Sequence, residues 1–148
     1  MKNIVCSGAL FYALDTERFL FLHRTQGKKA NVWGIVGGTN EEAETPWLSL
    51  KREIFEEIGE REIIKPIPLE TFVSTDKKFC FHTYVCFVKK EFIPLLNHEH
   101  NGYSWVTYGK WPNPLHYGLK NTLAKKYNRD KLETIFEITE LLKNDNER

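Results

Sequence analysis

Runs rich in Ile, Val, Leu, Phe and Tyr recur along the chain and are bounded by polar or turn-forming residues. Such runs are typical of β-strands. The predicted strands cover residues 3–14, 19–22, 33–38, 78–89 and 103–108, and a further strand ends an irregular connection over 63–73 that contains Pro66 and Pro68. Because only a short polar turn separates the first two strands, we expect them to pair as a hairpin.

The remaining apolar residues follow the three- and four-residue spacing of helices. The predicted helices cover residues 46–58, 115–127 and 130–142, and a frayed tail is expected over 144–148. Pro112 and Pro114 precede the second helix, and Asp130 can cap the third. Strands with interspersed helices in one chain indicate an α/β sandwich with a mixed sheet.

The helix over 46–58 is bounded at both ends by its own sequence. Thr45 is a good N-cap, Pro46 suits the first helical position, and Gly59 is a typical C-terminal stop. At ~100° per residue, its core-facing residues fall within an arc of roughly 80°, and two more are expected to extend that apolar side. The arc holds Trp47, Leu50, Ile54 and Ile58, and the expected extension is Leu48 and Phe55.

Four glutamates lie on the opposite side of the same helix, within about 100° of arc. They are Glu53, Glu56, Glu57 and Glu60. Like charges at this spacing repel each other, so the helix gains no stability from that face unless a cation neutralises it. Carboxylates on adjacent turns supply the oxygen ligands that hard divalent cations such as Mg²⁺ prefer. From the helix alone, a solvated acidic face without metal stays an open alternative.

Composition and charge exclude several classes of protein. The chain has 148 residues, 41% of them hydrophobic, which is the size and core content of one domain, and we expect a single domain over 1–148. Its 21 basic and 20 acidic residues argue against a general nucleic-acid binder or a polybasic membrane binder. Acidic and basic residues are not balanced along the whole chain, because residues 41–62 contain eight acidic and three basic residues.

Several features favour a cytoplasmic location. No apolar run approaches the roughly 18–20 residues of a membrane span, and the first residues lack the pattern of a secretion signal. The three cysteines are odd in number and form no CxxC pair, so we expect reduced thiols. His98 and His100 flank Glu99, and we interpret the two histidines as parts of a polar loop rather than as metal ligands.

The spacing around the acidic helix resembles a known signature. Gly38 is followed after five residues by Glu44, and after seven more by Arg52-Glu53-Ile54-Phe55-Glu56-Glu57-Ile58-Gly59. This arrangement resembles the Nudix box of the Nudix (MutT-like) hydrolases, with one departure: Glu60 occupies a position that is usually aliphatic. The resemblance covers roughly residues 3–127 and implies an α/β fold, the Nudix-type α/β/α sandwich with a mixed β-sheet.

The resemblance also implies an activity and a cofactor. Nudix enzymes hydrolyse a nucleoside diphosphate linked to another group and use Mg²⁺ or Mn²⁺, which bridges phosphate oxygens and lowers the pKa of the attacking water. Glu53, Glu56 and Glu57 are implied as metal ligands, and Glu53 alternatively helps to deprotonate the water. Arg52 is implied to pair with Glu44 and so to orient the catalytic helix.

Further residues are implied around the signature. Gly37 and Gly38 are expected to let the backbone approach the phosphates, since glycine permits a positive φ and close contact. Glu99 is a candidate for an additional carboxylate that acts as base or metal ligand, and His116 is a weaker alternative base; solvent exposure is the competing interpretation for both. Arg24 faces either substrate or solvent. We interpret the aromatic residues Phe79, Phe81 and Tyr84 as sheet or core residues.

The predicted function is a metal-dependent pyrophosphohydrolase. Nucleoside triphosphates, dinucleoside polyphosphates, nucleotide sugars and capped RNA 5′ ends all remain possible substrates, and both a monomer and a homodimer are compatible with the sequence. The alternative is a non-catalytic module of the same fold that binds a nucleotide as a sensor or scaffold. The complete set of Arg52, Glu53, Glu56 and Glu57 disfavours that alternative.

Overall fold

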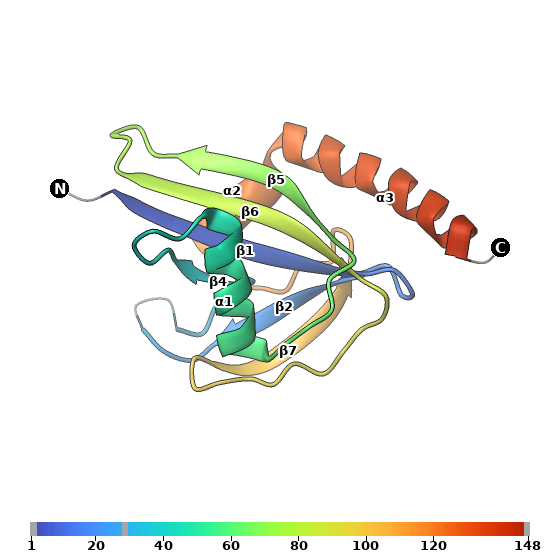
Figure 1. The fold of residues 1–148 in the computed structure, drawn as a ribbon, viewed down its shortest axis with the longest axis horizontal. Helices are drawn as coiled ribbons and strands as arrows, with labels where there is room; N and C mark the ends of the chain where they lie inside the picture. The colour runs from blue at the N-terminus through green and yellow to red at the C-terminus, as the bar shows by residue number, and fades with distance from the viewer. Residues whose placement is uncertain (1–2, 28–29, 147–148) are drawn as a thin grey trace.

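The computed structural model describes residues 3–27 and 30–146. Its strands are β1 (Ile4–Ala13), β2 (Arg18–Arg24), β3 (Trp33–Gly34), β4 (Val36–Thr39), β5 (Lys65–Val73), β6 (Phe79–Val88) and β7 (His100–Thr107). Its helices are α1 (Pro46–Ile58), α2 (Tyr117–Ala124) and α3 (Lys126–Asn146) (Figure 1).

The strands of the described residues form one mixed sheet with β1 in its interior. The main order is β3-β2-β1-β6-β5; β4 also pairs with β1, and β7 also pairs with β2. The pairing of β1 with β6 is parallel along the whole of β1, and the other pairings are antiparallel. The expected hairpin is confirmed, because Tyr12 of β1 lies opposite Phe19 of β2.

The alternation of side chains along β1 gives each face of the sheet its own core. Phe11 belongs to one cluster with Leu50 and Ile54 of α1, whereas its neighbour Tyr12 belongs to a second cluster with Leu119 of α2 and other residues of α2 and α3. Successive residues of a strand point to opposite faces, so β1 supports both clusters. Helix α1 therefore covers one face and α2 with α3 the other (Figure 1), which confirms the predicted α/β/α sandwich.

Helix α1 begins and ends where its capping residues predict. The Thr45 hydroxyl accepts a hydrogen bond from the Leu48 amide at 3.2 Å, and Gly59 has a φ of 86°. The expectation that Leu48 and Phe55 extend the buried side is wrong, since they are 54% and 66% exposed. Glu57 is buried in their place. At ~100° per residue Glu57 lies only about 20° from Leu50, so the buried arc extends toward the glutamate side.

Strand β5 includes the two prolines that the sequence assigned to an irregular connection. Pro66 and Pro68 lie opposite Cys86 and Tyr84 of β6, and the register shifts between Pro68 and Glu70. Since β5 is at the end of the main strand order, one side of its backbone pairs with no other strand of the described residues. Proline lacks an amide donor and is tolerated on such an edge strand.

The C-terminal helices differ from the prediction over 115–142. Helix α2 stops at Ala124, Lys125 is extended with a ψ of 132°, and α3 starts at Lys126 rather than at Asp130. Of the tail expected to fray over 144–148, residues 144–146 are helical, and residues 147–148 lie outside the described part of the chain.

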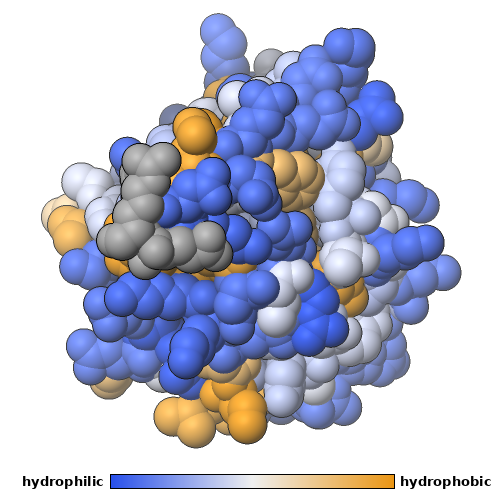
Figure 2. Space-filling view, turned by 90° about the vertical axis from the view of Figure 1, so that its right-hand side faces the viewer, coloured by the Kyte–Doolittle hydropathy of each residue, from blue (hydrophilic) through white to orange (hydrophobic). Residues whose placement is uncertain are grey.

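Within residues 3–27 and 30–146, no helix is both long enough and apolar enough to cross a membrane. The end of the molecule that holds the β1–β2 turn and the C-terminal part of α3 is covered mainly by hydrophilic residues, with hydrophobic ones in separate groups (Figures 1 and 2).

Candidate active site

Two carboxylates and one imidazole converge where α1 approaches the start of β7. Glu57 comes from the last turn of α1, and Glu99 and His100 come from the end of the β6–β7 connection and the first residue of β7. One donor atom from each of these three residues lies within 4.8 Å of the other two. Ligand atoms bound to one ion at 2.0–2.3 Å require comparable separations, so the three residues fit a shared cation.

Glu57 is held in place by a backbone amide of β4. Its Oε2 accepts a hydrogen bond from the Gly37 N–H at 2.8 Å, and only 2% of the residue is exposed. A Cβ at Gly37 would collide with the carbonyl oxygen of Ser7 in the paired strand β1. A Cβ at Gly38 would lie 2.5 Å from the Glu53 carboxylate. Neither glycine has a positive φ, so the close contacts with Ser7 and Glu53 are what exclude a side chain at these two positions.

Burial makes the charge on Glu57 unfavourable. Desolvation raises the pKa of Glu57 to about 9, the Gly37 amide opposes this, and the nearby Glu53 and Glu99 raise the pKa further. Desolvation also raises the pKa of Glu53, with Arg52 opposing it. A site that places acidic groups so close together fits a divalent cation, which would stabilise their charged forms.

Arg52 contacts the carboxylates around it. Its Nε and Nη2 donate to the two oxygens of Glu44 at 2.8 and 3.1 Å, and its Nη1 donates to Glu53 at 3.1 Å and Glu56 at 3.2 Å. Glu44 also accepts from the Glu41 amide at 2.7 Å. The fork of Arg52 therefore fixes the start of α1 relative to the preceding loop. The hydrogen bonds to Glu44 lower the pKa of that carboxyl.

The backbone at Glu99 is anchored to the end of β2. The Thr25 amide donates to the Glu99 carbonyl at 2.9 Å, and the Glu99 amide donates to Asn97 Oδ1 at 2.9 Å. The adjacent His100 is 7% exposed, and its buried Nδ1 has no hydrogen-bond partner within residues 3–27 and 30–146. Sequence reasoning set His100 aside as a loop residue. Its only sequence signal was its position next to Glu99.

A cleft of about 1100 Å³ opens beside these residues. Its lining includes polar residues such as Arg24, Glu53 and Glu99 together with aromatic side chains of β5 and β6. The aromatic lining residues of these strands are Phe72, Phe79 and Phe81. Phe79 and Phe81 are sheet residues, as expected, but they also face the cleft, which the sequence interpretation missed. Tyr84 packs instead against Trp47 of α1, with ring centroids 5.6 Å apart.

Two predicted site residues lie apart from the three-residue group. Glu56 has a half-exposed side chain and contacts Arg52 rather than Glu57 or Glu99. His116 lines the cleft, but its Nδ1 accepts hydrogen bonds from the amides of Gly118 and Leu119 and caps α2. A structural role for His116 thus has direct support, since that nitrogen is already engaged.

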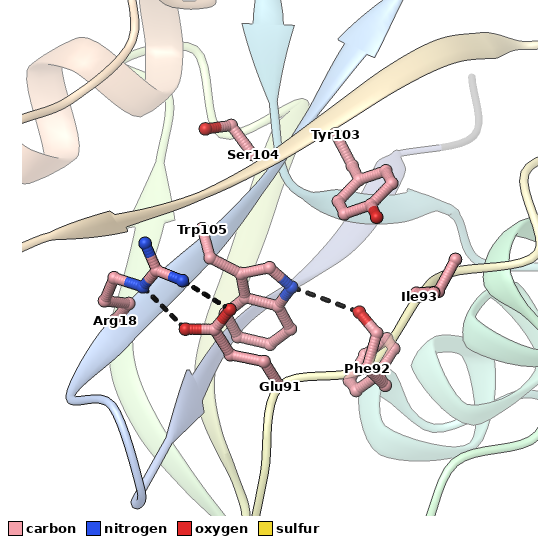
Figure 3. Close-up of a pocket in the computed structure, with 7 residues that line it drawn as sticks. All are labelled: Arg18, Glu91, Phe92, Ile93, Tyr103, Ser104 and Trp105. Carbon is pink, nitrogen blue, oxygen red and sulfur yellow. Dashed lines mark hydrogen bonds and ion pairs between the residues drawn. The ribbon is translucent and has the colours of Figure 1, made fainter.

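A second, shallower cavity of about 520 Å³ lies between β2, β7 and the connection that leads to Glu99 (Figure 3). Its polar groups bind one another. Arg18 pairs with both oxygens of Glu91 at 2.6 and 2.7 Å, and Trp105 Nε1 donates to the Phe92 carbonyl at 3.1 Å. None of the predicted site residues lines it. These contacts instead tie the β6–β7 connection to the sheet.

Comparison with known proteins agrees with this geometry. The family model of the NUDIX domain matches residues 5–126, which extend from β1 to the start of α3. The dihydroneopterin triphosphate diphosphatase of Haemophilus influenzae is 33% identical over 122 residues, which are 72% of this chain and 75% of that protein.

Solved structures show the same fold. The MutT protein from Methanosarcina mazei Go1 is similar with a TM-score of 0.70 and 24% identity, over 88% of this chain and 96% of that chain. The NUDIX domain of Shewanella oneidensis NrtR, solved with ADP ribose, is similar with a TM-score of 0.69 and 13% identity, over 89% of this chain and 90% of that chain.

Proposed function

Because the chain belongs to the NUDIX domain family of hydrolases, we propose that it is a divalent-metal-dependent pyrophosphohydrolase. The proposed substrate is a triphosphate joined to a flat ring system, such as a pterin or a nucleoside. Dihydroneopterin triphosphate is the first compound to test, because the relative of 33% identity is named for it.

One observation supports this proposal above the others. A single cleft combines the carboxylates of Glu53 and Glu99 with the phenyl rings of Phe72, Phe79 and Phe81. Carboxylates hold a divalent cation, and the cation in turn holds a polyphosphate. Aromatic rings pack against flat heterocycles by stacking or edge contacts. A substrate with a polyphosphate at one end and a ring at the other satisfies both parts of the lining.

The metal ligands are proposed from the same geometry. Glu57 and Glu99 are the carboxylates of the three-residue group, and Glu53 lies close enough to Glu57 to raise its pKa. When bound there, Mg²⁺ or Mn²⁺ would stabilise negative charge on the phosphates and lower the pKa of a water. Glu56, which the resemblance implies as a further ligand, would have to exchange its contact with Arg52 to take part.

The hydrolysis itself needs a base and an oriented helix. Water forms a new P–O bond at one phosphorus of an anhydride, the P–O bond to the leaving phosphate breaks, and a proton leaves the water. Glu53 and Glu99 both face the cleft and are the proposed acceptors of that proton. Arg52, bound to Glu44 through two hydrogen bonds, is proposed to hold α1 in the orientation that directs Glu53 and Glu57 inward.

Other cleft residues are proposed to bind the substrate. Arg24 lines the cleft near Glu99 and offers a cation to the phosphates. Gly37 and Gly38 bring the β4 backbone to the edge of the cleft. A Cβ at these positions would collide with Ser7 and with Glu53, respectively.

A substrate panel with Mn²⁺ and with Mg²⁺ tests the proposal. The panel contains dihydroneopterin triphosphate, the common nucleoside triphosphates, a dinucleoside polyphosphate, ADP-ribose, a nucleotide sugar and a capped RNA. We expect pyrophosphate release from a ring-bearing triphosphate. Micromolar binding of a nucleotide without turnover of any compound would favour the sensor alternative instead.

Substitutions on α1 test the residue assignments on the best substrate. We expect Glu57→Gln to lower kcat by roughly 100-fold or more, the scale on which a lost group that stabilises transition-state charge acts. Glu56→Gln is expected to lower it as well, because the resemblance places Glu56 in the ligand set. Glu60→Gln, an exposed glutamate one turn away, is the matched control and should leave kcat unchanged. Wild-type turnover in both Glu56→Gln and Glu57→Gln would contradict the assignment.

A further inference from the structure

An irregularity in the β2–β7 pairing lies directly next to His100. Consecutive residues of a regular strand point to opposite faces of the sheet. Here His23 lies opposite Gly102 and Arg24 lies opposite His100, so that Asn101 is an additional residue in β7. Such a bulge changes the direction of neighbouring side chains. In this arrangement a donor atom of His100 lies within 4.8 Å of the carboxylates of Glu57 and Glu99.

The imidazole of His100 also lacks a hydrogen bond that its burial requires. The residue is 7% exposed, and its buried Nδ1 has no partner among the described residues. An unsatisfied buried polar atom costs about 1–3 kcal/mol. The carboxylates of Glu57 and Glu99, each with an oxygen within 4.8 Å of a donor atom of His100, show that this location concentrates groups that bind cations. A cation bound to the imidazole would give the buried nitrogen a partner and would also neutralise the nearby carboxylates.

We propose that His100 is a metal ligand, so that the cation site of this protein consists of one imidazole nitrogen and the carboxylates of Glu57 and Glu99. The proposal rests on the metal-dependent function proposed above and specifies its metal. Mg²⁺ is bound almost entirely by oxygen ligands, whereas a site that includes an imidazole nitrogen binds first-row transition ions with an affinity that rises from Mn²⁺ toward Cu²⁺. The site is therefore selective for a first-row transition ion such as Mn²⁺ over Mg²⁺.

Pulsed electron paramagnetic resonance of the Mn²⁺ complex tests this ligand directly. Electron spin-echo envelope modulation detects a ¹⁴N nucleus bound to Mn²⁺, and we expect that modulation in the wild-type protein. It should be lost in His100→Gln and retained in His98→Gln, an exposed histidine of the same connection. Growth with ¹⁵N-histidine should replace the ¹⁴N pattern in the wild-type protein, which keeps the test decisive if His100→Gln fails to fold.

Calorimetric titration provides a second readout that a purely structural histidine would not change. His100→Gln should weaken Mn²⁺ binding by roughly 10- to 100-fold, the range for loss of a group that supports a metal site. Mg²⁺ binding should weaken much less, so the Mn²⁺ to Mg²⁺ affinity ratio should fall. An unchanged ratio, or a Mn²⁺ complex without ¹⁴N modulation, overturns the assignment of His100.

The two proposals can fail separately. If Glu57→Gln abolishes turnover while the Mn²⁺ complex shows no nitrogen coupling, the hydrolase proposal stands and His100 is a packing residue. If Glu57→Gln retains full turnover while the nitrogen coupling is present, the metal site exists but does not perform the proposed reaction.

Discussion

Gly37 and Gly38 show how two neighbouring residues of one type can have different requirements. A Cβ at Gly37 would meet the backbone of Ser7 and Gly8 in the paired strand, whereas a Cβ at Gly38 would meet the terminal atoms of the Glu53 side chain. Backbone atoms in a sheet cannot move away without breaking the ladder, but a carboxylate can rotate. Gly37 is therefore a requirement of the fold, and Gly38 a requirement of the cleft.

Alanine substitutions should separate these two roles. We expect Gly37→Ala to lower the free energy of unfolding by about 1–3 kcal/mol, as overpacking typically does. Gly38→Ala should change stability less but lower kcat, because the new methyl group displaces Glu53. Gly102→Ala is the control, since its Cβ would lie at an ordinary 3.6 Å from His23. Urea unfolding and steady-state kinetics on the same three variants measure stability and kcat. An equal loss of stability in Gly37→Ala and Gly38→Ala would contradict the separate roles of the two glycines.

Single residues of the site were predictable only in part. Glu53, Glu57 and Glu99 were all candidates, and all three lie at the site. The helical period places Glu57 next to Leu50, but it does not specify how far the buried arc of α1 extends on either side, which depends on where the sheet packs against the helix. His100 was missed because its proximity to Glu57 depends on how α1 lies relative to the start of β7, which no local sequence pattern specifies.

At the scale of elements, one buried carboxylate joins β5 to the two C-terminal helices. Glu70 of β5 accepts hydrogen bonds from Thr122, Lys125, Tyr127 and Asn128 at 2.6–2.9 Å. These four residues span the end of α2, the extended Lys125 and the start of α3. The network gives the break between α2 and α3 a structural reason, since both sides of the break converge on the same carboxylate.

The network should make stability depend on acid pH. Burial acts to raise the pKa of Glu70, but the hydrogen bonds from Tyr127, Lys125, Asn128 and Thr122 lower it to about 2, against 4.5 ordinarily. Because the native pKa is depressed, the stabilisation is present above pH 4.5 and is lost as pH falls toward 2. At about 1.4 kcal/mol per pKa unit, the contribution is about 3 kcal/mol.

Glu70→Gln tests the contribution of this hydrogen-bond network to stability. The variant should be less stable than the wild type at pH 7, and the difference should shrink between pH 5 and pH 2.5, because only the wild type loses the charged interaction there. Urea unfolding at several pH values measures both quantities. Glu137→Gln, an exposed residue of α3, is the control and should follow the wild type. A difference that is constant with pH would exclude an electrostatic role for Glu70.

Among the elements, α1 was predicted to the residue because its signals are local: Thr45, Pro46 and Gly59 specify its ends. The boundary between α2 and α3 was not predictable, since it depends on Glu70, more than fifty residues away in the sequence. The extent of β5 was underestimated for a similar reason. Considered from the sequence alone, Pro66 and Pro68 argue against a strand. They are tolerated because β5 lies at the edge of the sheet.

At the scale of the whole molecule, the site exists only because distant segments meet. Glu57 belongs to α1, Glu99 and His100 to the start of β7, and the aromatic lining to β5 and β6. The family resemblance identified the acidic helix and Glu99, but the aromatic part of the cleft follows from the three-dimensional arrangement. Because all these elements share one sheet, we expect the chain to unfold as a single cooperative unit.

Metal binding should therefore stabilise the whole chain. An ion that binds the native state at 100 times its Kd contributes about 2.7 kcal/mol, which for a domain of this size raises Tm by roughly 5–10 °C. Thermal unfolding with and without Mn²⁺ measures the shift. Glu57→Gln should abolish most of it, and Glu60→Gln should retain it. An equal shift in Glu57→Gln would place the bound ion elsewhere.

The same measurement should depend on pH in a defined direction. The pKa of Glu57 is about 9 in the native metal-free protein and 4.5 ordinarily, so between these values the native state holds a proton that the unfolded chain has released. Stability of the metal-free protein should therefore decline as pH rises through this window. Mn²⁺ competes with that proton, so its Tm shift should be larger at pH 8.5 than at pH 6. In Glu57→Gln both the decline and the pH-dependent shift should diminish, because one carboxyl group is the common cause. If only one of them diminished, the proton on Glu57 and the metal would occupy different sites.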